Sequence, residues 1–337
     1  MWPLSRKNSP KQFEVLKDNK STLQMAVERI AQFGLEHVFV STNERYADIV
    51  ARQIPALPAD HIFTEPAKRD LAAAMGLTLM RLKKQGVSGT VAVLWADHFM
   101  EKPANFVSAL KEAEALIEQD RERIVFLGEK ARFANHNLGW ICMGKPISDT
   151  VYSFAEWRYR PELEVCKKMF ESHEWVWNPG YFVFDIDFVL QLYKKHQTEM
   201  YDALENMTED ETMLRDQYPQ IEAISFDKAI LEKISPQDAV VLKVDLGWSD
   251  PGTLYALKEA LTLNQKDNFT KGESVLFNTT DSFVYNEEEQ KIVSVVGLEG
   301  VIVVNTKDSL LVCHKDAVPD ITTLLDQLRE DGKEQYL

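Results

Sequence analysis

The sequence predicts an α/β protein with a mixed, mostly parallel sheet, followed by a small β-rich C-terminal segment. From residue 37, short apolar runs alternate with longer helical periodicities, a pattern typical of βαβ units. After about residue 268, apolar runs recur roughly every eight or nine residues without helices between them, which favours either a small sandwich or a β-solenoid. We therefore predict one domain over residues 1–264 and a second over 265–337, the latter ending in a helix at 321–329.

The individual elements follow from the spacing of apolar residues. Strands are expected at 37–42, 90–95, 123–127 and 239–244, and a helix is expected at 253–263. Two further helices each present one apolar face, formed by Leu71, Met75, Leu79 and Leu82 in the first and by Phe106, Leu110, Ala113 and Ile117 in the second. The more irregular region 138–235 is interpreted as an insertion that covers the sheet edge.

Composition excludes several classes of function. The chain has 337 residues, 45% of them hydrophobic, which is enough for two cores. A formal net charge of −15 would repel polyanions, so we expect no nucleic-acid partner. No apolar run approaches the roughly 18 residues of a membrane span, so no membrane association is expected. The three scattered cysteines lack a C-x-x-C spacing and suit reduced thiols in a cytoplasm.

Two acids, Asp97 and Asp250, each follow an apolar strand and precede a helix. Ligands of open α/β sheets bind outside the carboxyl ends of the strands. Magnesium prefers carboxylate, phosphate and water oxygens, and commonly uses one or two carboxylates together with substrate phosphates. The alternative is that both residues only cap the helices that follow them, since Asp is a favoured N-cap. The spacing alone leaves both interpretations open.

An ordered series of motifs resembles the mannose-1-phosphate guanylyltransferases. The beginning of the chain, M-W-P-L-S-R at residues 1–6 and S-P-K-Q-F at 9–13, is similar to the start of that family's signature. Further similar motifs follow in the family's order at residues 65–70, 96–98, 139–141, 154–156, 177–182, 226–233 and 247–252. Each motif is weak to moderate by itself, but their common order makes coincidence improbable.

The resemblance implies a Rossmann-like nucleotidyltransferase domain with a small β-helical C-terminal domain. It also implies an enzyme in which mannose-1-phosphate attacks the α-phosphorus of GTP in line, giving GDP-mannose and pyrophosphate. Such chemistry depends on positioning and charge neutralisation more than on a covalent nucleophile. By this resemblance Asp97 and Asp250 hold Mg²⁺, and Lys11 neutralises the transferring phosphoryl group.

The resemblance assigns the remaining site residues to the two substrates. The nucleotide would be contacted by Arg6, Lys11, Glu65, Arg69 and Asp97, with Glu65 and Arg69 at the start of a helix. The sugar phosphate would be contacted by Gly139, Glu156, Asn178 and Arg158. Trp157 holds the position of a family lysine, and either Arg158 or Arg160 would replace its charge. Simpler interpretations stay open: Arg6 as an exposed cation, Glu65 as a first-turn acid and Asn178 as a turn former.

The glycine-rich loop that precedes W-P-L-S-R in the family has no counterpart in this sequence. We therefore expect an N-terminally truncated enzyme, and the alternative is a non-catalytic relative that binds nucleotide sugars and regulates a partner. A purely structural solenoid protein would explain only the C-terminal segment. The choice of guanine and the oligomeric state are not readable from the residues, although the C-terminal segment could mediate a homodimer.

Overall fold

The computed structural model describes residues 1–6, 10–17 and 19–337, so the first residue of the 9–13 motif lies outside the described residues. The chain divides into two compact units. The sheet unit contains Arg29–Trp95 and Glu101–Leu246, and the terminal unit contains Met1–Glu28, Ala96–Met100 and Gly247–Leu337. The predicted domain boundary near residue 264 stays a prediction.

The sheet unit is built on a seven-stranded sheet among the residues that the structure describes. In spatial order its strands are β10 (Trp175–Asn178), β8 (Gly139–Pro146), β9 (Val151–Tyr159), β12 (Ala239–Val244), β7 (Ile124–Glu129), β11 (Phe182–Asp185) and β5 (Thr90–Val93). β12 runs parallel to β7, whereas β11 is antiparallel to both β7 and β5. A separate parallel pair joins β3 (Val40–Asn43) to β4 (Ile62–Glu65).

The interpretation of region 138–235 as an insertion over the sheet edge is wrong. β11 lies inside the sheet between β7 and β5, and β8 and β9 continue the same sheet beyond β12. All four residues of β11 are buried, because helices cover both faces of the sheet at this point. A strand buried on both faces reads as a short continuous apolar run, and such a run does not reveal its place in the strand order.

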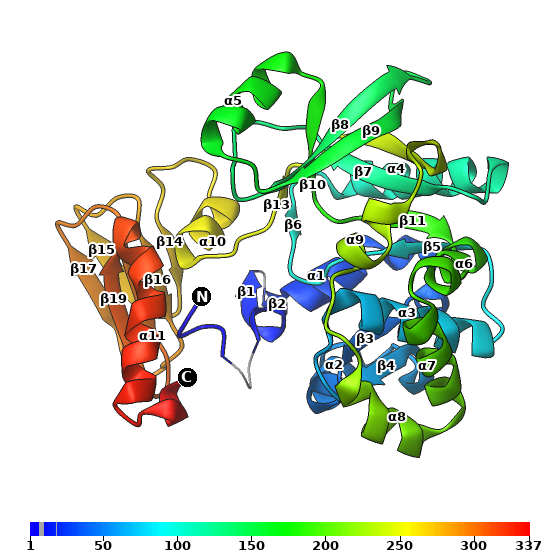
Figure 1. Cartoon of the computed structure of the whole chain (residues 1–337). Helices are drawn as coiled ribbons and strands as arrows, with labels where there is room; N and C mark the ends of the chain where they lie inside the picture. The colour runs from blue at the N-terminus through cyan, green and yellow to red at the C-terminus, as the bar shows by residue number, and fades with distance from the viewer. Residues whose placement is uncertain (7–9, 18) are drawn as a thin grey trace. The chain divides into compact units, whose positions relative to one another are not determined.

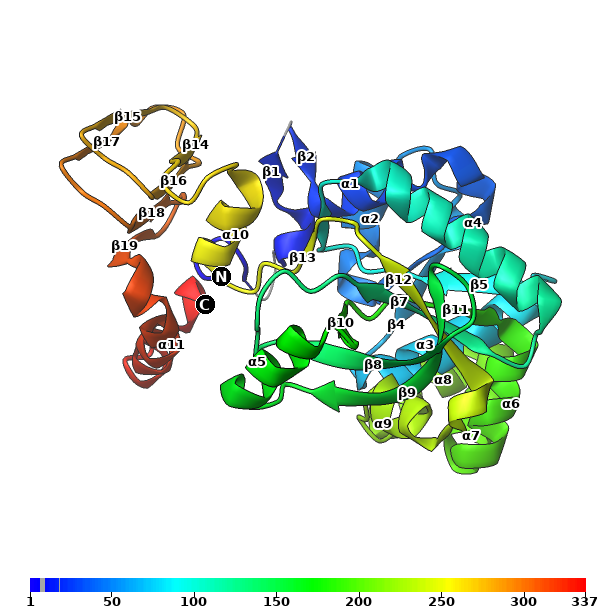
Figure 2. The same ribbon diagram turned by 90° about the horizontal axis from the view of Figure 1, so that it is seen from above.

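Helices cover the two faces of this sheet (Figure 2). α4 (Pro103–Gln119) lies on one face and buries the predicted residues Phe106, Leu110, Ala113 and Ile117. The opposite face carries α3 (Asp70–Lys84), α6 (Ile186–His196), α7 (Thr198–Glu209) and α9 (Phe226–Ala229). α5 (Leu163–Ser172), α2 (Ala47–Gln53) and α8 (Glu211–Gln217) complete the α-helices of this unit among the described residues.

The expectation that Glu65 begins a helix is wrong. Glu65 is the last residue of β4, where it pairs with Asn43 of β3, and α3 begins only at Asp70. The parallel strand pairing extends the chain up to Pro66, and this long-range pairing outweighs the local signal for a helix start. Arg69 occupies the N-cap position of α3 but makes no capping hydrogen bond with its side chain.

The C-terminal part of the terminal unit is a parallel β-solenoid, which excludes the sandwich (Figure 1). One face stacks β14 (Phe269–Lys271), β16 (Phe283–Asn286) and β18 (Val301–Asn305) in parallel, with β19 (Leu310–His314) added antiparallel. A second face stacks β15 (Ser274–Phe277) on β17 (Val293–Val296). The buried Asn305 donates to the Asn286 side chain at 2.7 Å across 19 residues, one turn of the solenoid. α11 (Ile321–Glu330) follows.

The N-terminal segment of the chain packs against this solenoid within the terminal unit. Trp2, Leu4 and Leu16 share a core with strands β16 and β18 and with α10 (Leu254–Leu261). The indole Nε1 of Trp2 donates to the carbonyl of Tyr336 at 2.7 Å, so the two ends of the chain lie side by side (Figures 1 and 2). The segment itself forms β1 (Val15–Lys17), β2 (Lys20–Ser21) and α1 (Thr22–Arg29).

A buried ionic cluster fixes α10 on the solenoid. Asp281 lies 2.7 Å from the Nζ of the fully buried Lys258 and 2.6 Å from that of Lys315, and Tyr255 Oη donates to both of its oxygens. Burial acts to raise the pKa of Asp281, but the hydrogen bonds from Lys258, Lys315 and Tyr255 outweigh it and the pKa is lowered. The helix that follows Asp250 in the chain is therefore held rigidly against the solenoid.

Candidate active site

Lys11, Asp97 and Asp250 meet in the terminal unit. The Nζ of Lys11 lies 2.9 Å from Asp97 Oδ2 and 3.3 Å from Asp250 Oδ1. It also lies 3.4 Å from the carbonyl oxygen of Pro251. The structure thus brings together the three residues that the sequence assigned to catalysis, with a single cation between two anions.

The two carboxylates are brought to one place by a short antiparallel strand pair. β6 (Phe99–Met100) pairs with β13 (Trp248–Ser249), with Ser249 opposite Phe99. Asp97 lies shortly before β6 and Asp250 directly after β13, so the antiparallel register puts both acids at the same end of the pair.

Neither acid is the N-cap of the helix that follows it. The N-cap of α10 is Thr253, whose Oγ1 accepts from Ala256 N at 3.1 Å, and the N-cap position of α4 is Lys102. The capping interpretation, which the spacing left open for both Asp97 and Asp250, is therefore wrong. Both carboxylates instead face the Nζ of Lys11.

Sequence reasoning missed the functional setting of His98. The indole Nε1 of the buried Trp248 donates to His98 Nδ1 at 3.0 Å. In a neutral imidazole this bond leaves the proton on Nε2, which faces Asp97 Oδ1 at 3.9 Å and Asp250 Oδ2 at 4.0 Å. The available signal was positional, since His98 directly follows Asp97 and Trp248 precedes Asp250 by two residues.

The two carboxylates stabilise the positive charge of Lys11. Burial acts to lower the pKa of Lys11, but the Asp97 and Asp250 carboxylates outweigh burial and raise this pKa. Lys11 therefore stays protonated at neutral pH. The side chains of Lys11, Asp97 and Asp250 are 21%, 29% and 39% exposed, so a phosphate-bearing ligand could reach all three.

The donor set fits a magnesium ion that completes its shell with phosphate and water. Asp97 and Asp250 offer hard carboxylate oxygens around a point that a cation, Lys11 Nζ, already occupies. Among the described residues, no group of three or more His, Cys, Asp or Glu side chains is arranged to hold a metal. Two carboxylates without a third protein ligand are the usual arrangement for Mg²⁺ bound together with substrate phosphates, rather than for a closed structural metal site.

Arg6 lies apart from this cation–carboxylate group and is engaged by the solenoid. Its guanidinium donates to both carboxylate oxygens of Asp308, at 2.7 and 2.6 Å. It also donates to Thr306 Oγ1 at 3.2 Å, Ser309 Oγ at 3.0 Å and the carbonyl of Pro3 at 3.1 Å. Its assignment to nucleotide binding stays a prediction.

Glu65 and Arg69, the other residues assigned to the nucleotide, lie in the sheet unit. Tyr218 Oη donates to Glu65 Oε2 at 2.6 Å. Burial raises the pKa of Glu65, while the Tyr218 hydrogen bond and the charge of Lys68 act in the opposite direction. The Nε of Arg69 is buried and has no hydrogen-bond partner among the described residues, so this donor is free for a ligand.

The residues assigned to the sugar phosphate lie on neighbouring strands of the sheet unit. Gly139 of β8 is opposite Asn178 of β10, and a Cβ at position 139 would lie 3.4 Å from the Asn178 Cβ. Asn178 Oδ1 accepts from Gly180 N at 2.9 Å, so the residue also acts as the turn former that the sequence left open. On β9, Arg158 donates to Glu156 Oε1 at 3.2 Å and stacks over Trp175.

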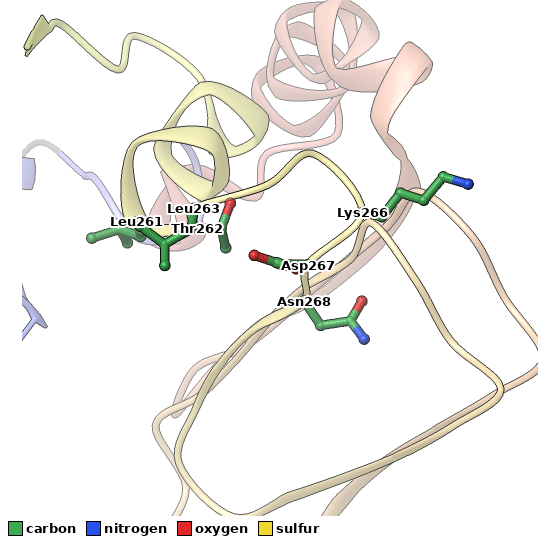
Figure 3. A pocket seen from close by; sticks show the side chains of 6 residues that line it. All are labelled: Leu261, Thr262, Leu263, Lys266, Asp267 and Asn268. Atoms are coloured by element: carbon green, nitrogen blue, oxygen red, sulfur yellow. The ribbon is translucent and has the colours of Figure 1, made fainter.

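A surface depression also lies at the end of α10 (Figure 3). It is lined by Leu261, Thr262, Leu263, Lys266, Asp267 and Asn268. Lys266 extends away from the other labelled side chains. The Asp267 carboxylate accepts a hydrogen bond from the backbone N–H of Asn264 at 2.9 Å. This depression therefore brings together no set of groups suited to catalysis.

The chain belongs to the nucleotidyl transferase family. The model of that family matches residues 1–267, and the model of the MannoseP isomerase/GMP-like beta-helix domain matches residues 272–328. Both matches agree with the folds described above. Among the described helices, none has the length and apolar character needed to cross a membrane.

Similar proteins indicate which members of the nucleotidyl transferase family this chain resembles in sequence and fold. Alginate biosynthesis protein AlgA of Pseudomonas syringae pv. tomato is 31% identical over 99% of this chain and 70% of that protein. Mannose-1-phosphate guanylyltransferase RfbM of Salmonella typhimurium is 28% identical over 100% and 71%, respectively. A crystal structure of mannose-1-phosphate geranyltransferase from Thermus thermophilus superposes with a TM-score of 0.86 at 25% identity, covering 98% of this chain and 95% of that one. The resemblance to the mannose-1-phosphate guanylyltransferases is confirmed, as is the expected α/β fold with a β-helix-like C-terminal domain. The expectation of a mostly parallel sheet is wrong, because among the described strands of the seven-stranded sheet only the β12–β7 pairing is parallel.

Proposed function

We propose that this chain catalyses transfer of the guanylyl group from GTP to mannose-1-phosphate, releasing pyrophosphate and forming GDP-mannose. The observation that carries the proposal is the placement of Lys11 between Asp97 and Asp250 in a member of the nucleotidyl transferase family. The names of the relatives supply the substrates. Cytoplasmic localisation, the choice of guanine and a homodimer stay predictions.

The protein groups at this site serve to position phosphates and balance their charge. In this proposal Asp97 and Asp250 hold Mg²⁺, which supplies charge neutralisation and orients the phosphates when bound. Lys11, kept protonated by both carboxylates, turns its Nζ to an oxygen of the transferring phosphoryl group. Trp248 fixes the ring of His98, whose Nε2 faces the two carboxylates at 3.9 and 4.0 Å.

Substrate recognition is proposed for residues of the sheet unit. The free Nε–H of Arg69 and the Glu65 carboxylate are assigned to the nucleotide. Glu156 and Asn178 are assigned to sugar hydroxyls, because carboxylate and amide groups discriminate hydroxyls that apolar groups cannot. Arg158 is assigned to the sugar phosphate, and Gly139 leaves space beside Asn178 for the sugar.

Pyrophosphate release from GTP and mannose-1-phosphate, measured with and without Mg²⁺, tests the proposal. We expect Asp250→Asn and Asp97→Asn each to lower kcat by on the order of 10² to 10³, the loss typical of removing one preorganised electrostatic group. Asp320→Asn, an exposed acid of the same unit whose side chain caps no helix, is the matched control and should leave kcat unchanged. Undiminished turnover in Asp250→Asn would refute the metal assignment. Nucleotide-sugar binding by the wild-type chain without turnover would favour the regulatory alternative.

A further inference from the structure

We infer that Arg6 and Asp308 form a positioning pair, through which the solenoid sets the place of Lys11 against its carboxylates. The inference rests on the proposed function, because it concerns how the site for phosphoryl transfer is held. It gives the C-terminal solenoid a part in catalysis, although no solenoid residue belongs to the group formed by Lys11, Asp97 and Asp250.

The contact that anchors Arg6 to the solenoid is made by several hydrogen bonds. Asp308 takes Arg6 through both carboxylate oxygens, and a bidentate pair of this kind restricts orientation as well as distance. Thr306 and Ser309, from the same turn between β18 and β19, accept from the same guanidinium. The Arg6 side chain is 16% exposed and the Asp308 side chain 42% exposed, so the pair lies at the surface and its rigidity comes from the number of hydrogen bonds to the guanidinium.

The Arg6–Asp308 pair is connected to Lys11 through Ser5. The residue next to Arg6 is Ser5, whose Oγ accepts from the backbone N–H of Lys11 at 3.1 Å. A continuous path therefore runs from Asp308 through Arg6 and Ser5 to the backbone of Lys11. The path reaches Lys11 at the first residue of a single 3₁₀ turn, Lys11–Phe13, which by itself has little rigidity.

Asp250, a partner of Lys11, is fixed to the same solenoid through the helix that follows it. Asp250 is followed by α10, whose residues Leu254 and Leu257 lie in the core that contains Trp2 and Leu4. The solenoid thus holds the lysine from one side and a carboxylate from the other. A shift of its β18–β19 turn would change the 3.3 Å distance between Lys11 Nζ and Asp250 Oδ1.

These contacts oppose a direct role of Arg6 in nucleotide binding. A phosphate would have to displace the Asp308 carboxylate from the same guanidinium edge, and it would meet the negative charge of Asp308 there. The pKa of the Asp308 carboxyl is lowered by its hydrogen bond with Arg6, so Asp308 is ionised at neutral pH.

The first test measures the accessibility of Lys11 without any substrate. The full chain is treated briefly with an amine-acylating reagent, and labelling of each lysine is followed by mass spectrometry. We expect Asp308→Asn and Arg6→Gln to raise labelling of Lys11 several-fold, with Asp97→Asn as the positive control. Lys20, paired with Glu28 on the surface, is the internal reference and should not change. Unchanged labelling of Lys11 in both variants would overturn the inference, whether or not the wild type turns over.

The second test separates positioning from substrate binding. For Arg6→Gln, Asp308→Asn and the double variant we expect the same loss of kcat, about 10-fold to 10²-fold, with the KM for GTP unchanged and no additivity. Arg6→Lys should lie between wild type and Arg6→Gln, because it keeps the charge without the bidentate geometry. A raised KM for GTP in Arg6→Gln alone would instead assign Arg6 to the nucleotide. Should Asp308→Asn fold poorly, Ser309→Ala removes one bond of the anchor and should give a smaller change of the same kind.

Discussion

The Tyr218 hydroxyl opposes the effect of burial on the pKa of Glu65. The hydrogen bond from Tyr218 favours the ionised carboxylate, whereas burial raises its pKa. A carboxyl whose pKa is raised on folding makes the folded state less stable as the pH rises from its unfolded pKa through its folded pKa. The ionised form of Glu65 is therefore a cost to the folded state at neutral pH, and Tyr218 reduces that cost.

We predict that Tyr218→Phe lowers the free energy of unfolding by about 1–3 kcal/mol at pH 7, because an ionised, half-buried carboxylate loses its donor. At pH 4 the loss should be smaller, because Glu65 is then protonated in the folded state. Urea unfolding at the two pH values measures this difference. Tyr201→Phe, which removes an exposed bond to Glu205, is the control and should change the stability little at either pH. An equal loss at both pH values would contradict the argument.

The three charged residues that the sequence singled out for catalysis lie together, but the residues that support them were not predicted. Lys11, Asp97 and Asp250 could be identified from the sequence because each belongs to one of the motifs that follow the family's order. The place of His98 depends on Trp248, 150 residues away, and on the register of the two short strands that bring them together. Arg6 likewise looks like an unpaired cation in the local sequence, because its partner Asp308 is 302 residues away.

Gly272 and Gly297 of the solenoid differ in the space that surrounds them, although both have a left-handed backbone conformation. Gly272 and Gly297 both have positive φ, +76° and +69°. A Cβ at Gly272 would overlap the carbonyl oxygen of Asn286, whereas one at Gly297 would meet nothing within 4 Å. The first glycine therefore provides space for a neighbouring strand, and the second provides only conformational freedom.

We predict that Gly297→Ala costs about 1 kcal/mol of stability, the usual cost of a left-handed non-glycine residue. Gly272→Ala should cost clearly more, because the backbone of β16 must also move to admit the new methyl group. Thermal or urea unfolding of both variants measures the difference, and wild type is the reference. Equal losses would show that the strands adjust freely at Gly272, contrary to the close packing described.

Among the helices and strands, apolar periodicity predicted those elements whose type depends only on their own residues. The strands of the solenoid, expected from the apolar runs after about residue 268, and the two amphipathic helices follow from local patterns. The strand order does not, because β11 enters the sheet between strands that lie far from it in sequence. β10 was missed because its residues read as a turn motif around Asn178 and Pro179.

For the molecule as a whole, binding of magnesium to the folded state should appear as added stability. We predict that Mg²⁺ raises the thermal midpoint of the chain measured with GTP above the midpoint with GTP alone, because the two carboxylates bind the ion together with substrate phosphates. A ligand present at 100 times its Kd contributes about 2.7 kcal/mol. The Asp97→Asn/Asp250→Asn double variant should lose this increase. Because the net charge of −15 attracts cations everywhere, Asp320→Asn serves as the control that keeps both carboxylates. An equal increase in the double variant would place the ion elsewhere.

The packing of the first residues against the last has a consequence for how this chain folds during synthesis. Trp2 reaches its partner Tyr336 across 334 residues. A ribosome adding about 5–20 residues per second needs on the order of tens of seconds to make that length. Until then Trp2, Leu4 and Leu16 lack the strands that bury them, and Arg6 lacks Asp308. The sheet unit can be assembled earlier, so Lys11 reaches its final position among the last events of folding.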